Sequence, residues 1–501
     1  MGGGWRYPTR TAPFPVPTQQ RAAETVRAAI DATVWLLERF TEDQVTLEAV
    51  RQRSGVSQGS LTHHFGGREG LLATAHVERY SRSVAADAQF LGAFAGALED
   101  RESFAAVMLG MIGDMLSPER REVRWLRMSA IAAAFGDPLL TETISDRYTA
   151  LADHLTSVVD IAPEHGILEP DVDVRTVALL VSMHAQGLVL DDIAGTEVSP
   201  HAWSRLLVEF VSAFLTPEAT AVLRRQEQER FGDLWRADVF GRIGRLPQEV
   251  EDRLTKLQQV ISRTDPDAAV GPQAMTDHAS VARMLLASTK VEADTRRSAS
   301  GRTVEARERL LAETVRALRE HGQSGVDTTR LRTVAGISPQ AFHRMFGTRD
   351  GLIREARVRL EVARSARSIA RFATLLEQAS CPAEVREALE VDAVKMSEEA
   401  SRGAMWQRME TLAACRTDQA LRDELAELQQ RTRDLLIEQV CLAQARGLID
   451  PGLPCRGVAR LLDGTVFWHV FHGLDEKRPA RDEWTADLRR VAAMVSPDQE
   501  R

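Results

Sequence analysis

The pattern of apolar and polar positions predicts two short pairs of helices, the first at residues 47–71. Leu61 and Phe65 lie four positions apart, so a helix places both on one face. Gly55 suits the positive φ of a tight turn between helices, and Ser57 is placed to cap the second helix. The stretch 328–352 repeats this pattern with Gly336, Ser338, Pro339, Phe342 and Phe346. Each stretch is therefore predicted to be a helix-turn-helix.

These two stretches belong to a longer repeat with a fixed spacing, the distance in sequence from Gly55 to Gly336. The same spacing relates landmarks far outside the helix pairs, namely Trp125 and Trp406, Met128 and Met409, Gly166 and Gly447, Pro170 and Pro451, and Trp203 and Trp484. A repeat of this length indicates a duplicated domain pair rather than a short shared motif.

Apolar positions at helical spacing continue beyond both pairs. Residues 172–190 are apolar nearly all round, which indicates burial on more than one side, and Gly187, Ala178 and Ala185 would permit close helix approach. Near the end of each half, an apolar stripe predicts a helix that needs a partner helix. The stripe includes Trp203, Leu207, Phe210 and Phe214 in the first half and Trp484, Leu488, Val491 and Val495 in the second.

Composition indicates a soluble globular protein of two or more domains. The chain has 501 residues, of which 44% are hydrophobic and 27% charged, and its net charge is −9. No apolar run is expected to reach the length of a membrane span, and the N-terminus lacks a signal-peptide core, which favours a cytoplasmic protein. Enzyme signature motifs are absent, so neither an enzyme nor a cofactor is expected. The cysteines (Cys381, Cys415, Cys441 and Cys455) are interpreted as idle thiols, with a redox-sensing pair as the alternative.

Both helix pairs resemble the DNA-binding part of the tetracycline-repressor (TetR) family of bacterial transcription regulators. The resemblance rests on residues 54–57 (SGVS) and 65–71 (FGGREGL), and on residues 335–338 (AGIS) and 346–352 (FGTRDGL). Two positions depart from the family pattern in each copy. The usual tyrosine of the recognition helix is Thr62 or His343, and the usual lysine is Arg68 or Arg349, which keeps the positive charge.

The resemblance implies an all-α fold of two tandem TetR-like units. Each unit would have an N-terminal three-helix helix-turn-helix domain and a C-terminal helical domain for ligand binding and dimerisation. In similar proteins the last two helices form a four-helix bundle between partners. The resemblance therefore implies that the two halves pair within one chain, with a homodimer as the alternative.

The pattern and the resemblance together predict six parts of the chain. Residues 1–19 are a disordered arm, either a passive tail or one whose arginines enter the minor groove of DNA. The connector is expected to hold a helix within residues 280–290. The other parts are a first DNA-binding domain at 20–77, a first regulatory domain at 78–223, the helical connector at 224–303, a second DNA-binding domain at 304–358 and a second regulatory domain at 359–497.

Candidate DNA contacts lie on and beside the second helix of each pair. Gln and Arg side chains can read base edges in the major groove, and hydroxyl or basic groups bind phosphates. The base-reading candidates are Gln58, Ser60, Thr62, His63, His64, Gln340, His343 and Arg344, and the phosphate candidates are Thr46, Arg68, Thr328 and Arg349. The histidine pair is otherwise a plain solvated pair, and no metal is expected there. The second copy carries more arginines and fewer acids, so we expect it to hold DNA more firmly.

Methionine and aromatic clusters in the regulatory parts have two interpretations. As single residues they are explained by a hydrophobic core. As a group they resemble the ligand pocket of this family, which would bind a small apolar effector. The candidate pocket residues are Met111, Trp125, Met128, Met183, His184, Trp406, Met409, Phe467, Trp468 and Phe471.

Two functional hypotheses follow. The first is a transcription regulator, predicted to be a repressor, whose two unlike heads read an imperfectly palindromic operator of double-stranded DNA and are released by the effector. The second is a TetR-like helical module in which one or both DNA heads are degenerate and which acts through ligand or protein contacts. Neither hypothesis involves a membrane.

Overall fold

The computed structural model describes residues 20–95, 98–135, 137–159, 165–232, 276–287, 301–396, 399–478 and 480–497. Within these ranges the regular structure is helical, and the β contact is one isolated bridge between Leu168 and Leu215. The all-α prediction is therefore confirmed for the described residues. The predicted arm at 1–19 and the connector segments 233–275 and 288–300 lie outside them.

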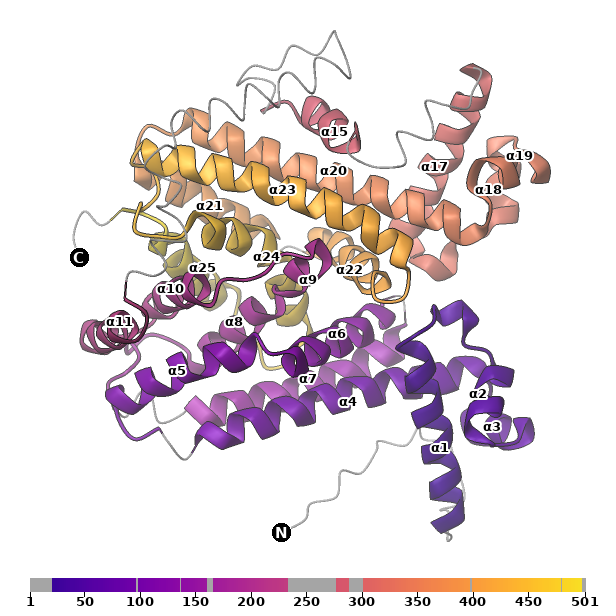
Figure 1. The fold of residues 1–501 in the computed structure, drawn as a ribbon, viewed down its shortest axis with the longest axis horizontal. Coiled ribbons are helices and arrows are strands. Elements are labelled where there is room, and N and C mark those ends of the chain that lie inside the picture. Colours follow the sequence, from indigo (N-terminus) through magenta and orange to yellow (C-terminus); the bar gives the residue numbers. More distant parts are fainter. Residues whose placement is uncertain are drawn as a thin grey trace. The chain divides into compact units, whose positions relative to one another are not determined.

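The chain divides into two compact units, residues 1–78 and residues 79–501. The first contains α1 (Gln20–Leu37), the 3-10 turn η1 (Glu42–Gln44), α2 (Leu47–Ser54), α3 (Gln58–Phe65) and the beginning of α4 (Arg68–Ala95), as labelled in Figure 1. Apolar residues at helical spacing give each helix one buried face. These faces meet in a core that includes Ile30, Val34, Leu37, Val45, Val50, Val56, Leu61 and Leu71.

The second unit is built from two runs of helices. After the rest of α4, the first run comprises α5 (Arg101–Met115), α6 (Pro118–Ala133), α7 (Pro138–Val159), α8 (Val174–Gln186), α9 (Val189–Ala194), α10 (Pro200–Ser212) and α11 (Pro217–Phe231). The second comprises α15 (His278–Ala287), α17 (Gly301–His321), η2 (Gln323–Gly325), α18 (Thr328–Ala335), α19 (Pro339–Phe346), α20 (Arg349–Gln378), α21 (Pro382–Met396), α22 (Glu399–Ala414), α23 (Gln419–Ala445), α24 (Cys455–Leu474) and α25 (Arg481–Met494). The helix α15 overlaps the range 280–290 predicted for a connector helix but begins two residues earlier, and α11 extends past residue 223.

The repeat spacing seen in the sequence recurs in the helix bounds. The bounds of η1, α2, α3, α5 and α6, shifted by the spacing between Gly55 and Gly336, coincide with those of η2, α18, α19, α21 and α22. It recurs in a loop contact as well, because the backbone N–H of Glu169 donates to Phe214 O at 3.0 Å and that of Asp450 to Val495 O at 2.9 Å. Equivalent sequence signals therefore produce equivalent local structures.

Helices of the first run pack against helices of the second run within residues 79–501. The closest associations join α6 with α22, α8 with α24, and α9 with α23. At one of these approaches a Cβ added to Gly187 would lie 3.7 Å from the Cα of Gly464, which is an ordinary contact distance, so the approach does not require a glycine there. In the second run α20 and α23 lie alongside each other, with α15 packed against α20 (Figure 1).

One apolar stretch corrects the sequence analysis. Residues 174–194 are long and apolar enough to cross a membrane by length and composition, whereas no such run was expected. The most apolar window of this stretch is 72% buried inside the protein, which is typical of a core helix in a soluble protein. It corresponds to α8 and α9, which pack against α24 and α23.

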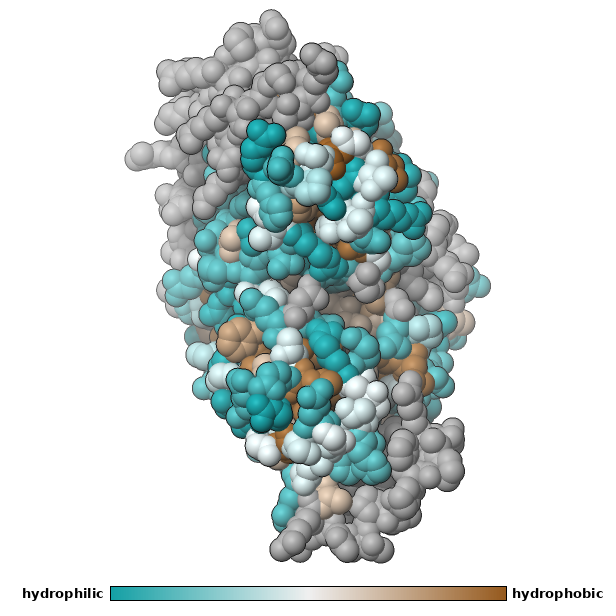
Figure 2. Space-filling view, turned by 90° about the vertical axis from the view of Figure 1, so that its right-hand side faces the viewer, coloured by the Kyte–Doolittle hydropathy of each residue, from teal (hydrophilic) through white to brown (hydrophobic). Residues whose placement is uncertain are grey.

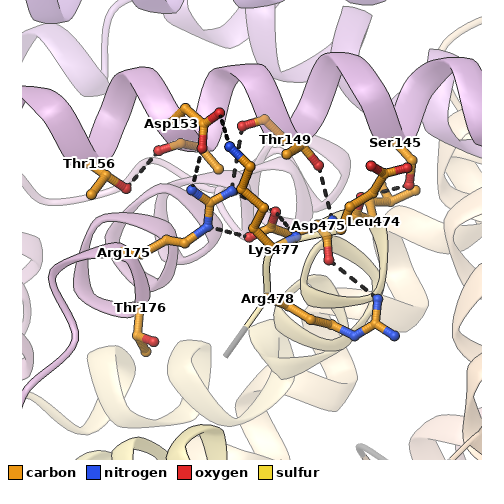
Figure 3. A network of polar contacts seen from close by, with 12 residues as sticks. Ser145, Thr149, Asp153, Thr156, Arg175, Thr176, Leu474, Asp475, Lys477 and Arg478 are labelled. Atoms are coloured by element: carbon orange, nitrogen blue, oxygen red, sulfur yellow. Dashed lines mark hydrogen bonds and ion pairs between the residues drawn. The ribbon is translucent and has the colours of Figure 1, made fainter. Parts of the chain in front are cut away.

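Buried charges join the two runs of helices. The carboxylate of Asp475, just after α24, is fully buried and accepts two hydrogen bonds of 2.7 Å from the guanidinium of Arg175 on α8 (Figure 3). Arg175 also donates to Asp153 on α7, which pairs with Lys477 at 2.8 Å. In a second cluster, the buried Asp191 of α9 accepts from Arg460 of α24 at 2.7 Å and pairs with Arg433 of α23 at 2.8 Å.

The surface in Figure 2 is mostly hydrophilic, and hydrophobic residues occur there in small groups. Large hydrophobic side chains that are exposed among the described residues are scattered along the sequence, namely Phe40, Leu139, Val334, Val391 and Leu442. Scattered exposed apolar residues are ordinary in soluble proteins.

Candidate functional site

The turn between α2 and α3 has the geometry that the sequence predicted. Gly55 ends α2 with φ 72°, a left-handed conformation that favours glycine. The hydroxyl of Ser57 then caps α3 by accepting a hydrogen bond from the backbone N–H of Ser60 at 3.2 Å. On the same helix Leu61 is fully buried, which fixes the face that α3 turns toward the core.

The same geometry recurs between α18 and α19. Gly336 has φ 69°, the hydroxyl of Ser338 accepts from the backbone N–H of Ala341 at 3.2 Å, and Pro339 occupies the first turn of α19. Proline is favoured there because its missing N–H would have no partner within the helix. Phe342 is buried in place of Leu61, so the opposite face of α19 is free of the core.

The structure places most of the predicted base-reading residues on exposed helix faces. Gln58, Thr62 and His63 are exposed on α3, while Ser60 and His64 are half-buried. On α19 the three candidates Gln340, His343 and Arg344 are all exposed. His343 also has a contact within the protein, because its Nδ1 lies 2.7 Å from Gly347 O. Base reading by these side chains stays a prediction.

Arg68 and Arg349 were predicted to bind phosphates, and both bind backbone carbonyls of their own domain. The Nε of Arg68 donates to Val45 O at 2.9 Å, and its guanidinium also donates to Glu42 O at 2.5 Å. Arg349 makes the equivalent bonds to Val326 O at 3.3 Å and Gln323 O at 2.9 Å. Each arginine therefore fastens the 3-10 turn before the helix pair to the helix after it, a contact that we call the arginine clip. A phosphate contact by either residue stays a prediction.

The two threonines predicted to bind phosphate occupy unlike positions. Thr46 is exposed and caps α2, with its hydroxyl accepting from the backbone N–H of Ala49 at 3.1 Å. Thr328 is the half-buried first residue of α18, and the cap of that helix is the carboxylate of Asp327, which accepts from the N–H groups of Thr329 and Arg330. We call α2 with α3 the first head and α18 with α19 the second head. The second head therefore has an acid at the position where the first has a hydroxyl, which weakens the attraction of phosphate at that point.

Ion pairs set the charge that each head presents. In the first head Arg51 donates two hydrogen bonds of 2.6 Å to Glu48, so an acid neutralises it. In the second head the equivalent positions hold Arg332 and Thr329, which gives no such pair. Within the described part of the chain, the exposed Arg344 makes no ion pair. These contacts agree with the expectation that the second head is the more basic.

Two of the cavities among the described regulatory helices contain predicted pocket residues. The first has a volume of about 130 Å³ and is lined mainly by apolar residues of α5 and α8, with Met108, Met111 and Met115 on one wall and α6 on another. Its polar lining consists of Asp87, Arg120, Arg124, Arg127 and Ser182. The second has a volume of about 750 Å³ and lies beside α20 and α24. Its lining includes His278 of the connector helix α15 and the buried residues Arg408 and Asp463.

Most of the predicted pocket residues lie in the core rather than on these cavities. Met111 lines the first cavity and Trp468 lines the second. The other eight do not line either one and are buried on α6, α8, α22 and α24, namely Trp125, Met128, Met183, His184, Trp406, Met409, Phe467 and Phe471. Sequence reasoning missed the arginines of the first cavity. Their spacing on α6 (120, 124 and 127) marks one helix face, but burial of that face could not be read from the sequence.

The predicted interface residues are all buried. Trp203, Leu207, Phe210 and Phe214 belong to α10 or follow it, and Trp484, Leu488, Val491 and Val495 belong to α25 or follow it. Part of this burial involves the other run of helices, because the ring centroids of Phe210 and Trp468 lie 5.8 Å apart. The helix α10 also contacts α24 and α25.

The cysteines are free thiols. Burial raises the pKa of Cys415 to about 12, which keeps that thiol protonated and unreactive at neutral pH. The thiol of Cys455 lies 2.8 Å from Gln444 Oε1, and a hydrogen bond with Cys441 lowers the pKa of Cys455. The predicted idle role therefore fits Cys415 better than the pair Cys441 and Cys455.

Comparison with known proteins identifies the first head. Residues 29–75 match the family model described as bacterial regulatory proteins, tetR family. The match begins within α1, includes α2 and α3, and ends in α4. A comparison with curated proteins finds no match. The family match supports a DNA-binding helix-turn-helix regulator of transcription.

Proposed function

Because residues 29–75 carry the tetR-family DNA-binding domain, we propose that this protein is a transcriptional repressor with two DNA-reading heads. The observation that supports it most directly is the exposed polar face of α3 within the matched segment, opposite the buried Leu61. A short helix that is anchored by one apolar face and exposed on the other can enter the major groove.

The second head is proposed to be α18 and α19. Its support is the recurrence of the turn glycine, the serine cap and the arginine clip at the repeat spacing from those of the first head. Since α3 and α19 present different side chains, the proposed operator is an imperfect palindrome. In such an arrangement the two recognition helices would bind about 34–36 Å apart, one turn of DNA.

The two halves are proposed to pair with each other, so that a single chain takes the place of the two subunits of a TetR dimer. This pairing is supported by the association of equivalent helices, α6 with α22, and by buried ion pairs such as Arg175 with Asp475. A monomer in solution would have the mass of one chain, 55.5 kDa, and a homodimer twice that. Light scattering on the DNA-free protein distinguishes the two assemblies, and a dimer at micromolar concentration would contradict the proposal.

The proposed repressor is cytoplasmic and is released from DNA by a small, largely apolar effector held among the regulatory helices. The effector would act through a difference in its affinity for two arrangements of the helices. Contacts between the second head and the regulatory helices give a route for such coupling. The backbone N–H of Gln323 donates to Glu410 of α22 at 3.0 Å, and Arg354 donates to the α23 cap Asp418 at 3.0 Å.

DNA binding is tested by electrophoretic mobility shift with the DNA upstream of the protein's own gene. Arg344→Ala removes an exposed side chain proposed to read a base and is expected to weaken binding by about 1–3 kcal/mol, roughly 5- to 150-fold. Arg431→Ala is the matched control, because it removes an exposed arginine from α23, outside both heads. Equal binding by both variants would refute the role of Arg344.

The same assay separates the repressor from a module with degenerate heads. The first head carries the neutralised Arg51, so its own contribution is tested with Gln58→Ala. A loss of binding in both Gln58→Ala and Arg344→Ala indicates two working heads. Absence of specific binding by the unaltered protein at low salt would favour the degenerate module.

A further inference from the structure

The cavity between α5, α6 and α8 contains more positive than negative charge. Arg120, Arg124 and Arg127 occupy positions i, i+4 and i+7 of α6, so they share one face of the helix, and all three line the cavity. Asp87 is the carboxylate among the lining residues. The remaining lining is almost entirely apolar, which makes the three guanidinium groups the main polar feature of the site.

Asp87 pairs with two of the arginines and leaves the third without a carboxylate. One carboxylate oxygen of Asp87 accepts from Arg120 and the other pairs with Arg127. Arg124 is buried, with 7% of its surface exposed, and its Nη1 donates to Met115 O at 2.6 Å. Within the described residues its Nε has no hydrogen-bond partner and its guanidinium makes no ion pair. Isolated buried charges are costly, so a site of this kind favours an anion.

The nearby acids Asp191 and Asp192 attract Arg124, but within the described residues neither makes an ion pair with it. Asp191 is held by Arg433 and Arg460, and Asp192 pairs with Arg121 at 3.0 Å. The second half has no equivalent arrangement, because the repeat spacing carries Arg120 and Arg124 onto Ser401 and Met405. A buried guanidinium without a direct ion pair is therefore a specific feature of the first cavity.

We propose that this cavity binds a small amphipathic carboxylate, with its apolar part against the methionines and its carboxylate on Arg124. The volume of about 130 Å³ limits the apolar part to the size of one ring, since a cavity of roughly 150 Å³ accommodates benzene. A planar guanidinium can hold a carboxylate through two parallel hydrogen bonds, which gives charge and orientation together. The inference rests on the proposed function, because it names the chemical class of the effector.

Isothermal titration calorimetry on the full chain without DNA tests the inference. Benzoate and its neutral isostere benzamide are the probes. We expect benzoate to bind at least about tenfold more tightly than benzamide, because one charge-assisted hydrogen bond contributes about that factor to an affinity. Arg124→Met should reduce the affinity for benzoate to that for benzamide, whereas Arg489→Met, at an exposed arginine of α25, should leave the ratio unchanged.

A second variant tests the cavity without altering the arginines. Ala178→Phe, on the wall formed by α8, fills the cavity and should abolish binding of both probes. Circular dichroism verifies that each variant is folded. The inference would be overturned if the protein bound benzoate and benzamide equally, or if it showed no saturable binding of benzoate at millimolar concentration. It would also be overturned if folded Arg124→Met kept the preference for benzoate over benzamide, or if Ala178→Phe bound the probes as well as the unaltered protein.

The calorimetric result is independent of DNA binding. If the protein bound benzoate selectively but gave no mobility shift with DNA, the proposed repressor function would be refuted and the carboxylate site would still be supported. Specific DNA binding without benzoate selectivity would refute the carboxylate site alone.

Discussion

Asp475→Asn tests how strongly the buried charge network joins the two runs of helices. The substitution keeps the shape of the side chain and removes its negative charge. In the native protein the fully buried carboxylate accepts from Nε and Nη2 of Arg175, and from the backbone N–H of Lys477 at 3.1 Å (Figure 3). The variant therefore leaves the Arg175 guanidinium, itself only 11% exposed, with a weaker partner in the protein interior.

The expected loss is about 2–3 kcal/mol of the free energy of unfolding, because breaking a buried ion pair by removing one partner costs about 3–5 kcal/mol while the other charge stays buried. Two features place this pair at or below the low end of that range. An asparagine oxygen still accepts one hydrogen bond from Arg175, and Arg175 keeps its 2.7 Å contact with Asp153.

Asp153→Asn is the matched control, because it removes the other carboxylate bound to the same arginine. The Asp153 side chain is 44% exposed, so its loss should cost about 0.5 kcal/mol. Urea unfolding followed by circular dichroism measures both differences. Equal losses in the two variants, or no loss in Asp475→Asn, would refute the argument that burial makes this pair strong.

Two further predictions concern a buried histidine and the arginine clip. Burial between the rings of Trp203 and Phe210 lowers the pKa of His184 from 6.5 to about 3, so the unfolded chain takes up a proton first as pH falls. Stability should decline below pH 6.5, by about 2 kcal/mol at pH 5, and His184→Phe should remove this part of the decline in urea titrations at pH 7.5 and 5. Arg68→Lys should lower the opening free energy of α2 by about 1 kcal/mol in hydrogen exchange, because an ammonium does not reproduce the forked contact with two carbonyls. Arg51→Lys, on the exposed face, should change it by less than about 0.5 kcal/mol, and similar effects would contradict the clip.

The sequence determined the helices, the turns and the buried faces of α3 and α19. Periodicity identifies the buried face of α3, while Gly55 and Ser57 identify the turn and the cap, because these signals act over a few residues. The fixed spacing between Gly55 and Gly336 predicted where the second helix pair would begin. Local chemistry was sufficient for each of these features.

The tertiary structure alone decided what long side chains contact. Arg68 and Arg349 were predicted from the sequence to bind phosphate, yet their guanidinium groups bind backbone carbonyls 23 and 26 residues away. No sequence motif marked Arg124, yet it is buried beside a methionine-lined cavity. Periodicity gives the face on which a residue lies, but the partner of that face depends on which distant helix packs against it, and no local pattern encodes that choice.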